Sequence, residues 1–236
     1  MISRKMNPDY QPNFEAGEVI LIDKPFNLSS FRVIEKVRKL INFRKIGHAG
    51  TLDPLATGLL ILCTGKKTKE ITKYQQSIKR YIGIFTLGYY SESYDKETEL
   101  KIFPIPNDIT EEKILTTAQK FIGEIKQLPP MYSAIKVNGK RLYQSARKGL
   151  EVQRNSRVVT IYNFFIDKID LPDIHFTVEC SKGTYIRALA DDFGKELGTR
   201  AILSSLRRTK IGDFDVEDAL ELEEFSKLFS QKITVQ

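Results

Sequence analysis

A short stretch of the chain, GHAGTLDPLATG at 47–58, could hold one carboxylate in a fixed position for chemistry. Its three glycines let the backbone turn tightly or approach a ligand closely. Pro54 fixes its own φ and biases Asp53 toward an extended conformation. Catalysis needs a reactive group held within a fraction of an ångström, and such a loop can provide that. The stretch therefore predicts Asp53 as a functional carboxylate, although Asp-Pro and Gly-Thr also occur in plain turns.

The nearby pair Gly65-Lys66 is not a phosphate-binding loop. That motif requires a glycine five residues before the Gly-Lys pair, and Leu60 stands there. It also requires Ser or Thr after the lysine, where this chain has Lys67. A Walker-type nucleotide site is excluded.

Three clusters interleave basic and aromatic residues. They are Lys66, Lys67, Lys69 and Lys73 with Tyr74; Lys79 and Arg80 with Tyr81; and Lys136, Lys140 and Arg141 with Tyr143, followed by Arg147 and Lys148. Cations that neutralise phosphates and rings that stack on splayed bases hold single-stranded RNA loops. Each cluster alone also fits a solvated surface with core-facing tyrosines. Together with a net charge of +7, they favour a nucleic-acid partner.

Three further residues have a more open interpretation. His48 fits either a turn histidine or a ring that stacks on bases or wedges between them. Arg187 begins a predicted helix and could hold a carboxylate ionised and oriented. His175 alternates with apolar residues on a predicted strand, which favours a structural role.

The patterning predicts the elements that must position these residues. We expect strands at 19–22, 80–87, 133–137, 157–166 and 174–180, with a buried segment at 59–64 and a tight turn at Asn138-Gly139. We expect a helix capped by Ser29 or Ser30, and helices at 66–76, 108–121, 184–197 and 216–229, with 201–210 mixed. Hairpins and alternation outnumber strict βαβ units. This favours an α+β fold with a mixed, mostly antiparallel sheet.

Length and composition limit the class of protein. The 236 residues are 41% hydrophobic and 28% charged, which excludes wholesale disorder. The two cysteines, Cys63 and Cys180, form at most one disulfide, so a secreted disulfide scaffold is excluded and a cytoplasmic setting is expected. The apolar run at 59–63 is far shorter than the ~20 residues needed to span a bilayer. No His/Cys spacing suggests zinc, so no metal is expected.

Taken together, the motifs closely resemble the TruB family, the bacterial tRNA pseudouridine-55 synthases. The stretch 47–58 matches the catalytic motif of the family, except that the family has Thr where Ala49 stands. Matching segments follow in the same order: 21–25 with Ser29-Ser30, 79–81, 131–136, 180–187 and 206–208. The family usually has Gly at the position of Asn27. Because Asn also tolerates a left-handed backbone, we expect this turn to survive.

The resemblance covers about residues 18–215 and implies a pseudouridine synthase fold and reaction. In that reaction the N1–C1′ bond of uridine 55 in the tRNA T-loop breaks, the uracil turns, and C5 bonds to C1′. It needs no cofactor. A base inside a folded loop cannot be reached in place, so it must be flipped out.

The resemblance also assigns catalytic roles. Asp53 matches the catalytic aspartate that acts on the flipped nucleotide. Tyr81 would stack on the uracil and help to take the C5 proton, and Arg187 would pair with Asp53. The aspartate could attack C1′, add to C6 or abstract the C2′ proton, and the sequence does not choose among these routes.

Four more residues match substrate-binding positions of the family. His48 matches the histidine that fills the space vacated by the flipped base. Lys24 and Asp95 match positions near the active site, and Leu206 belongs to the short motif at 206–208.

The resemblance also sets the expected organisation. We expect a flexible arm at 1–17, a catalytic domain at 18–236, and no C-terminal PUA domain, which many family members carry. The expected partner is the T-arm of tRNA, with no membrane, no obligate protein partner and a monomeric state. Two alternatives stay open: a non-catalytic T-loop RNA-binding or RNA-folding module, and a synthase of the same chemistry on another RNA.

Overall fold

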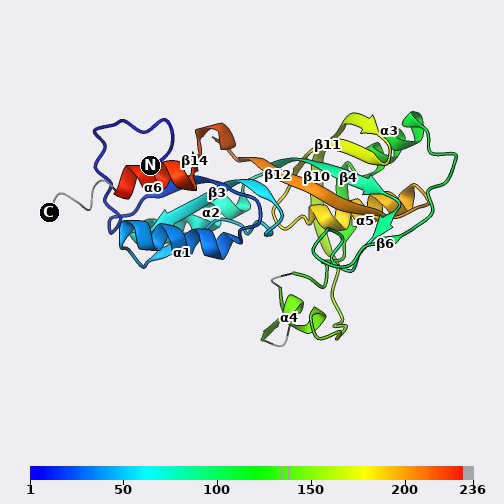
Figure 1. Cartoon of the computed structure of the whole chain (residues 1–236), viewed down its shortest axis with the longest axis horizontal. Helices are drawn as coiled ribbons and strands as arrows, with labels where there is room; N and C mark the ends of the chain where they lie inside the picture. The colour runs from blue at the N-terminus through cyan, green and yellow to red at the C-terminus, as the bar shows by residue number, and fades with distance from the viewer. Residues whose placement is uncertain (134, 138, 231–236) are drawn as a thin grey trace. The chain divides into compact units, whose positions relative to one another are not determined.

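The structure, a computed structural model, describes residues 1–133, 135–137 and 139–230 (Figure 1). It divides into unit 1, Met1–Tyr81 with Arg207–Gln236, and unit 2, Ile82–Leu206. The chain passes from one unit to the other within two strands, β4 (Lys79–Leu87) and β12 (Ala201–Ile211). Ala134 and Asn138, which belong to the predicted strand and turn near 133–139, lie outside the described residues.

Unit 1 contains a mixed sheet with helices. Its elements are β1 (Val19–Lys24), α1 (Ser30–Ile41), β2 (Ile46–His48), β3 (Thr57–Thr64), η1 (Gly65–Glu70), α2 (Ile71–Gln76), β13 (Phe214–Asp215), η2 (Val216–Asp218), β14 (Leu220–Glu221) and α6 (Leu222–Ser230). The strand order is β14-β1-β3-β12, with β2 beside β3 and β13 beside β12. Strand β3 is antiparallel to β1 and β2 and parallel to β12.

The sheet of unit 1 is buried on both faces. Ile20 and Ile22 of β1 pack with α1 and α6, whereas Val19 and Leu21 pack with Tyr74 of α2 and the η2 segment. A strand covered on both faces needs apolar residues at successive positions rather than in alternation. This explains the unbroken apolar runs of β1 and β3.

Helix α1 begins where its sequence predicts. The Ser29 hydroxyl accepts a hydrogen bond from the Arg32 amide at 3.2 Å and caps the helix. The preceding turn contains Asn27 at φ 62°, so the left-handed position predicted to survive without glycine is confirmed. The helix ends at Asn42, also left-handed with φ 47°.

The segment 1–17 has little regular secondary structure, yet part of it packs into unit 1. Ile2 pairs with Ile20 in a parallel bridge and is fully buried. The Tyr10 hydroxyl donates to the Glu18 carboxylate at 2.7 Å. We expected a flexible arm over 1–17 because this polar segment shows no periodicity; a single apolar residue such as Ile2 leaves no periodic signal.

Unit 2 combines a sheet with helices α3 and α5. Its elements, besides parts of β4 and β12, are β5 (Tyr89–Tyr90), β6 (Lys101–Ile102), α3 (Glu111–Lys120), β7 (Gly123–Gln127), β8 (Lys136–Val137), β9 (Lys140–Arg141), α4 (Leu142–Ala146), β10 (Arg157–Asp170), β11 (Asp173–Cys180) and α5 (Ile186–Glu196). The order is β12-β4-β11-β10-β7, and β10 is antiparallel to both neighbours. Its core contains four buried rings, Phe85, Phe164, Phe176 and Phe193.

Three local predictions were wrong. Residues 201–210 form one strand rather than a mixed segment. Residues 216–229 do not form one helix, because Leu220 pairs with Ile22 of β1 and interrupts it before α6. Helix α3 is capped by Thr110, whose hydroxyl accepts from the Lys113 amide at 3.2 Å, rather than by a capping box at Asp108.

Gly58 offers a matched test of close packing. It has φ +104°, and a Cβ built on it would lie 2.3 Å from the Arg208 carbonyl oxygen. Gly123 has the same φ, +104°, with nothing within 4 Å of its Cβ position. We expect Gly123→Ala to lower the free energy of unfolding by about 1–2 kcal/mol through backbone strain alone. Gly58→Ala should cost at least about 2 kcal/mol more, because backbone must move. Equal losses in urea unfolding would contradict this.

Candidate active site

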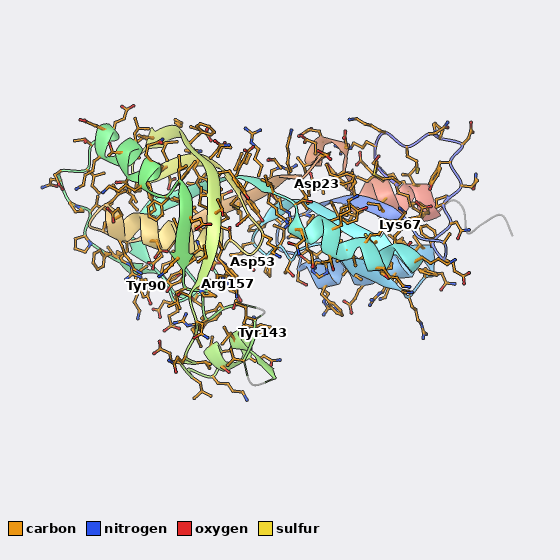
Figure 2. All side chains as sticks on the ribbon, turned by 180° about the vertical axis from the view of Figure 1, so that it is seen from behind. Asp23, Asp53, Lys67, Tyr90, Tyr143 and Arg157 are labelled. Carbon is orange, nitrogen blue, oxygen red and sulfur yellow. The ribbon has the colours of Figure 1, made fainter. Side chains whose placement is uncertain are left out.

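Asp53 lies on the loop that joins the antiparallel strands β2 and β3 of unit 1 (Figure 2). The loop is closed at its base, where the Ala49 amide donates to the Ile61 carbonyl at 2.9 Å. Leu52 and Ala56, on either side of Asp53, are each 3% exposed, while Asp53 itself is half-buried. The Ala56 amide donates to the Asp53 carbonyl at 3.1 Å and closes a turn. The carboxylate is therefore carried by a short, anchored segment.

Ser30 pins this loop to the start of α1. Its hydroxyl donates to the Leu52 carbonyl at 2.9 Å and accepts from the Leu52 amide at 2.9 Å. Ser30 is 1% exposed, so the two bonds are shielded from water. The hydroxyl fixes both backbone groups of the residue immediately before Asp53. The sequence indicates Ser30 as a candidate helix cap and as part of a segment that matches the family, without a role at the Asp53 loop.

Lys24 pins the loop on the other side of Asp53. Its Nζ donates to the carbonyls of Pro25 at 2.9 Å, Leu28 at 2.7 Å and Pro54 at 3.3 Å. The side chain is fully buried, and burial lowers the pKa of its ammonium to about 8. The Asp53 carboxylate acts in the opposite direction and raises this pKa, which makes the two charges electrostatic neighbours.

Arg208 on β12 completes the support of the loop. Its Nε donates to the Leu59 carbonyl at 2.8 Å and its Nη2 to the Gly50 carbonyl at 3.1 Å. The guanidinium is almost entirely buried. Beside it, Arg207 binds Asp23 through two bonds of 3.0 and 2.6 Å. Sequence patterning did not single out Arg208 by itself, because its partners are carbonyls that leave no residue signature.

His48 sits at the end of β2, next to the loop. Its Nε2 lies 3.0 Å from the Thr51 hydroxyl. Burial, and then the nearby Arg208 cation, lower the pKa of the imidazole from its usual value. Both effects favour the neutral form of the ring. A neutral aromatic ring suits contact with a base face, and a turn histidine would show the same hydrogen bond.

The basic and aromatic clusters differ in their surroundings. Tyr74 is 8% exposed and meets Phe214 edge to face, so the core interpretation is confirmed for it. Lys79 is 6% exposed and its Nζ donates to carbonyls at the end of α2. Tyr81 on β4 is 8% exposed. In the third cluster Arg147 lies over the Tyr143 ring at 5.6 Å, and the side chains of Lys136, Lys140 and Arg141 lie outside the described residues.

Unit 2 brings Arg187 and Asp95 together. The Arg187 Nη1 lies 3.3 Å from the Asp95 Oδ2, and both side chains are at most 5% exposed. Arg187 also donates to the carbonyls of Ser93 at 3.1 Å and Tyr132 at 2.9 Å. Asp95 in turn accepts from the Glu97 amide at 2.9 Å. The guanidinium is thus held by one charge and two carbonyls in a buried setting.

The backbone around this pair is also constrained. Asp95 forms a parallel bridge with Leu203 of β12, and Tyr94 adopts φ 61°. The Leu203 amide donates to the Tyr94 carbonyl at 2.9 Å. Leu206, three residues further along β12, is 8% exposed.

Gln127, which the sequence did not indicate, fixes the start of α5. Its amide oxygen accepts from the Tyr185 amide at 2.8 Å, and its Nε2 donates to the Tyr185 carbonyl at 3.0 Å. Tyr185 occupies the N-cap of α5 without a capping bond from its own side chain. The fully buried Gln127 therefore sets the backbone two residues before Arg187.

Comparison with known proteins places these units in a class. Residues 38–186 match the model of the TruB family pseudouridylate synthase N-terminal domain. Residues 187–234 match the tRNA pseudouridylate synthase B C-terminal domain. The two matches define a protein with the pseudouridylate synthase fold.

The curated relatives narrow the class to one family. "tRNA pseudouridine synthase B" of Flavobacterium johnsoniae is 50% identical over 219 residues, covering 89% of this chain and 95% of the relative. The protein of the same name from Phocaeicola vulgatus is 45% identical over 226 residues, covering 93% and 96%. The chain belongs to the TruB family.

Solved structures agree on the fold. A chain in "Crystal Structure of a Cbf5-Nop10-Gar1 Complex" matches with a TM-score of 0.73 and 29% identity, covering 97% of this chain. A chain in an H/ACA RNP bound to a substrate RNA matches with a TM-score of 0.70 and 27% identity. This chain spans 60% of the length of each of those chains. Among the described residues, no helix is long and apolar enough to cross a membrane.

Lys24 predicts a specific pH dependence of stability. The pKa of its ammonium is about 8 in the folded protein and about 10.4 in an unfolded chain. Between these values the unfolded chain binds more protons, so folding is favoured as pH rises. We expect the unfolding free energy of wild type, relative to Lys24→Met, to increase by about 1–3 kcal/mol from pH 8 to 10.5. The same comparison with Lys36→Met, an exposed lysine on α1, should stay flat. A flat curve for both would refute the burial argument.

Gln127→Glu tests the support of Arg187. The carboxylate keeps the acceptor for the Tyr185 amide but faces the Tyr185 carbonyl without a donor. We expect a loss of about 1–3 kcal/mol in unfolding free energy, with a slower single-turnover rate measured below the unfolding transition. The exposed Gln119→Glu is the matched control and should change neither. Wild-type turnover by Gln127→Glu would show that this contact does not position Arg187 for the reaction.

Proposed function

We propose that this chain isomerises uridine 55 in the T-loop of tRNA to pseudouridine. The observation that carries the proposal is the anchored, half-buried Asp53 in the TruB motif, in a chain whose curated relatives are named tRNA pseudouridine synthase B. The N1–C1′ bond breaks, the uracil turns, and C5 bonds to C1′. The C5 proton then leaves and N1 gains a proton, so the composition of the nucleotide is unchanged. The chain is thus an isomerase.

Asp53 is the catalytic group in this proposal. The glycosidic bond is broken during isomerisation, so the Asp53 carboxylate must keep its position while the base turns. The bonds from Ser30 to Leu52 and from Lys24 to Pro54 limit the movement of the loop on both sides of Asp53. Such preorganisation removes the cost of orienting the group during reaction.

Tyr81 and Arg187 are the other proposed catalytic residues. Tyr81 stacks on the uracil and helps to remove the C5 proton. Arg187 supplies the cation that keeps the reacting carboxylate ionised. The bonds that Arg187 makes to Asp95, Ser93 and Tyr132 support this role, because they fix the guanidinium before substrate arrives.

The substrate-binding residues follow the same proposal. His48, neutral and aromatic, fills the space left by the flipped base. Lys24 holds the loop, Asp95 orients Arg187, and Leu206 gives an apolar contact to the uracil. We further propose that the protein acts as a monomer in the cytoplasm on the T-arm alone, without an obligate protein partner, since one uridine and one carboxylate suffice for this chemistry.

Asp53→Asn separates chemistry from binding. We expect it to abolish turnover while the affinity for tRNA stays within a few-fold, because one carboxylate carries the chemistry and many cations carry the affinity. The assay is tritium release from a T-arm transcript labelled at uridine C5, with the product mapped to position 55. Asp213→Asn, an exposed aspartate of unit 1, is the matched control and should retain wild-type release. Near wild-type release by Asp53→Asn would remove Asp53 from the mechanism. No release by wild type, with binding retained, would overturn the proposed reaction.

A further inference from the structure

Two phenylalanines in unit 1 are unusually exposed. Phe26 is 61% exposed and Phe31 is 58% exposed, the highest values among the aromatic side chains of the described residues. Single exposed apolar residues are common on protein surfaces and need no explanation. The two lie within six positions, whereas most other Phe and Tyr rings of the described residues are at least partly buried, so they form a local feature.

Both phenylalanines are adjacent to groups that hold the Asp53 loop. Phe26 lies in the turn whose Pro25 and Leu28 carbonyls accept from Lys24, the residue that also reaches Pro54. Phe31 follows Ser30, which is bonded to Leu52. Both phenylalanines are therefore next in sequence to residues that bind the backbone on either side of Asp53, within one unit.

The short segment that carries the two rings contains no acidic residue. No carboxylate occurs between Lys24 and Ile34, and α1 has no acidic residue in its first turn. The partial positive charge at the start of this helix is therefore not offset locally. Arg32, next to Phe31, has a side chain that is 70% exposed and forms an ion pair of 3.0 Å with Glu35 on the same helix. Exposed rings on a segment without carboxylates suit unpaired bases, because nothing in that segment repels their phosphate backbone.

We propose that Phe26 and Phe31 form an aromatic rim on which unpaired bases of the substrate RNA stack next to the uridine that Asp53 acts on. The inference rests on the proposed function and adds a binding surface to it. Neither ring touches the reacting atoms, so the rim contributes to binding and to the choice of loop sequence rather than to the chemical step. Base stacking on a protein ring is sequence-tolerant, because every base has a π-face.

The first test measures binding and turnover of a T-arm stem-loop by Phe26→Ala and Phe31→Ala. We expect the Kd and KM of each variant to rise roughly 5- to 100-fold, the range of one lost stacking contact, with kcat unchanged at saturation. Phe→Tyr at each position should restore affinity, because the ring is kept. Phe165→Ala, which removes a 54% exposed ring from β10 of unit 2, is the matched control and should bind as wild type does.

A second arm pairs each variant with T-arm stem-loops that carry one abasic nucleotide at successive loop positions. If a ring stacks on a given base, removing that base should abolish the difference in Kd between wild type and the alanine variant. Coupling at one or two positions for each ring would support the rim. Wild-type binding by both alanine variants would overturn it, and so would an equal loss on every abasic RNA. In those cases tritium release by wild type would show that the proposed function stands without the rim.

Discussion

The ammonium group of Lys24 is fully buried, and its three carbonyl partners belong to the turn after β1 and to the loop that carries Asp53. A buried charge is costly unless its donors are satisfied, so these segments must keep their relative positions for the fold to remain stable. Ser30 and Arg208 add carbonyl and amide contacts at Leu52 and Gly50. The hydrogen bonds that satisfy the buried Lys24 ammonium therefore also hold the loop that carries Asp53. Moving the Asp53 loop would leave buried donors without partners, so the position of this loop and the stability of the fold are coupled.

Both units contain buried charged side chains, but their cores are built differently. In unit 1 the strands are covered on both faces, and the buried Lys24, Ser30 and Arg208 bind backbone groups of the Asp53 loop. In unit 2 a cluster of four phenylalanines forms the core, and the buried Arg187–Asp95 pair lies among the carbonyls of Ser93 and Tyr132. Gln127 gives α5 the backbone bonds that its own N-cap residue lacks. In both units a charged group is fixed mainly by carbonyl oxygens.

Sequence patterning predicted well wherever the signal was local. A cap at Ser29 or Ser30, the strands at 80–87 and 174–180, and the mixed, mainly antiparallel sheet followed from residue type and spacing. The left-handed turn at Asn27 followed from the family resemblance. Patterning failed where a distant strand decided the outcome. Residues 216–229 have a helical pattern, yet pairing of Leu220 with Ile22 breaks it. Tyr74 of α2 and Lys79 of β4 fitted nucleic-acid clusters, yet both are buried, because a one-dimensional pattern does not show which side of an element faces the core.

The sequence by itself determined the family and the identity of the candidate catalytic residue. The motif at 47–58 is contiguous, and its glycines, proline and aspartate carry their conformational preferences wherever they stand. Only the tertiary structure decided what holds that motif. Lys24, Ser30 and Arg208 reach it through backbone amides and carbonyls, and every residue except proline offers the same amide and carbonyl. Such contacts leave no mark on the sequence of the residue that receives them. They appear only when the sheet brings β1, β3 and β12 side by side.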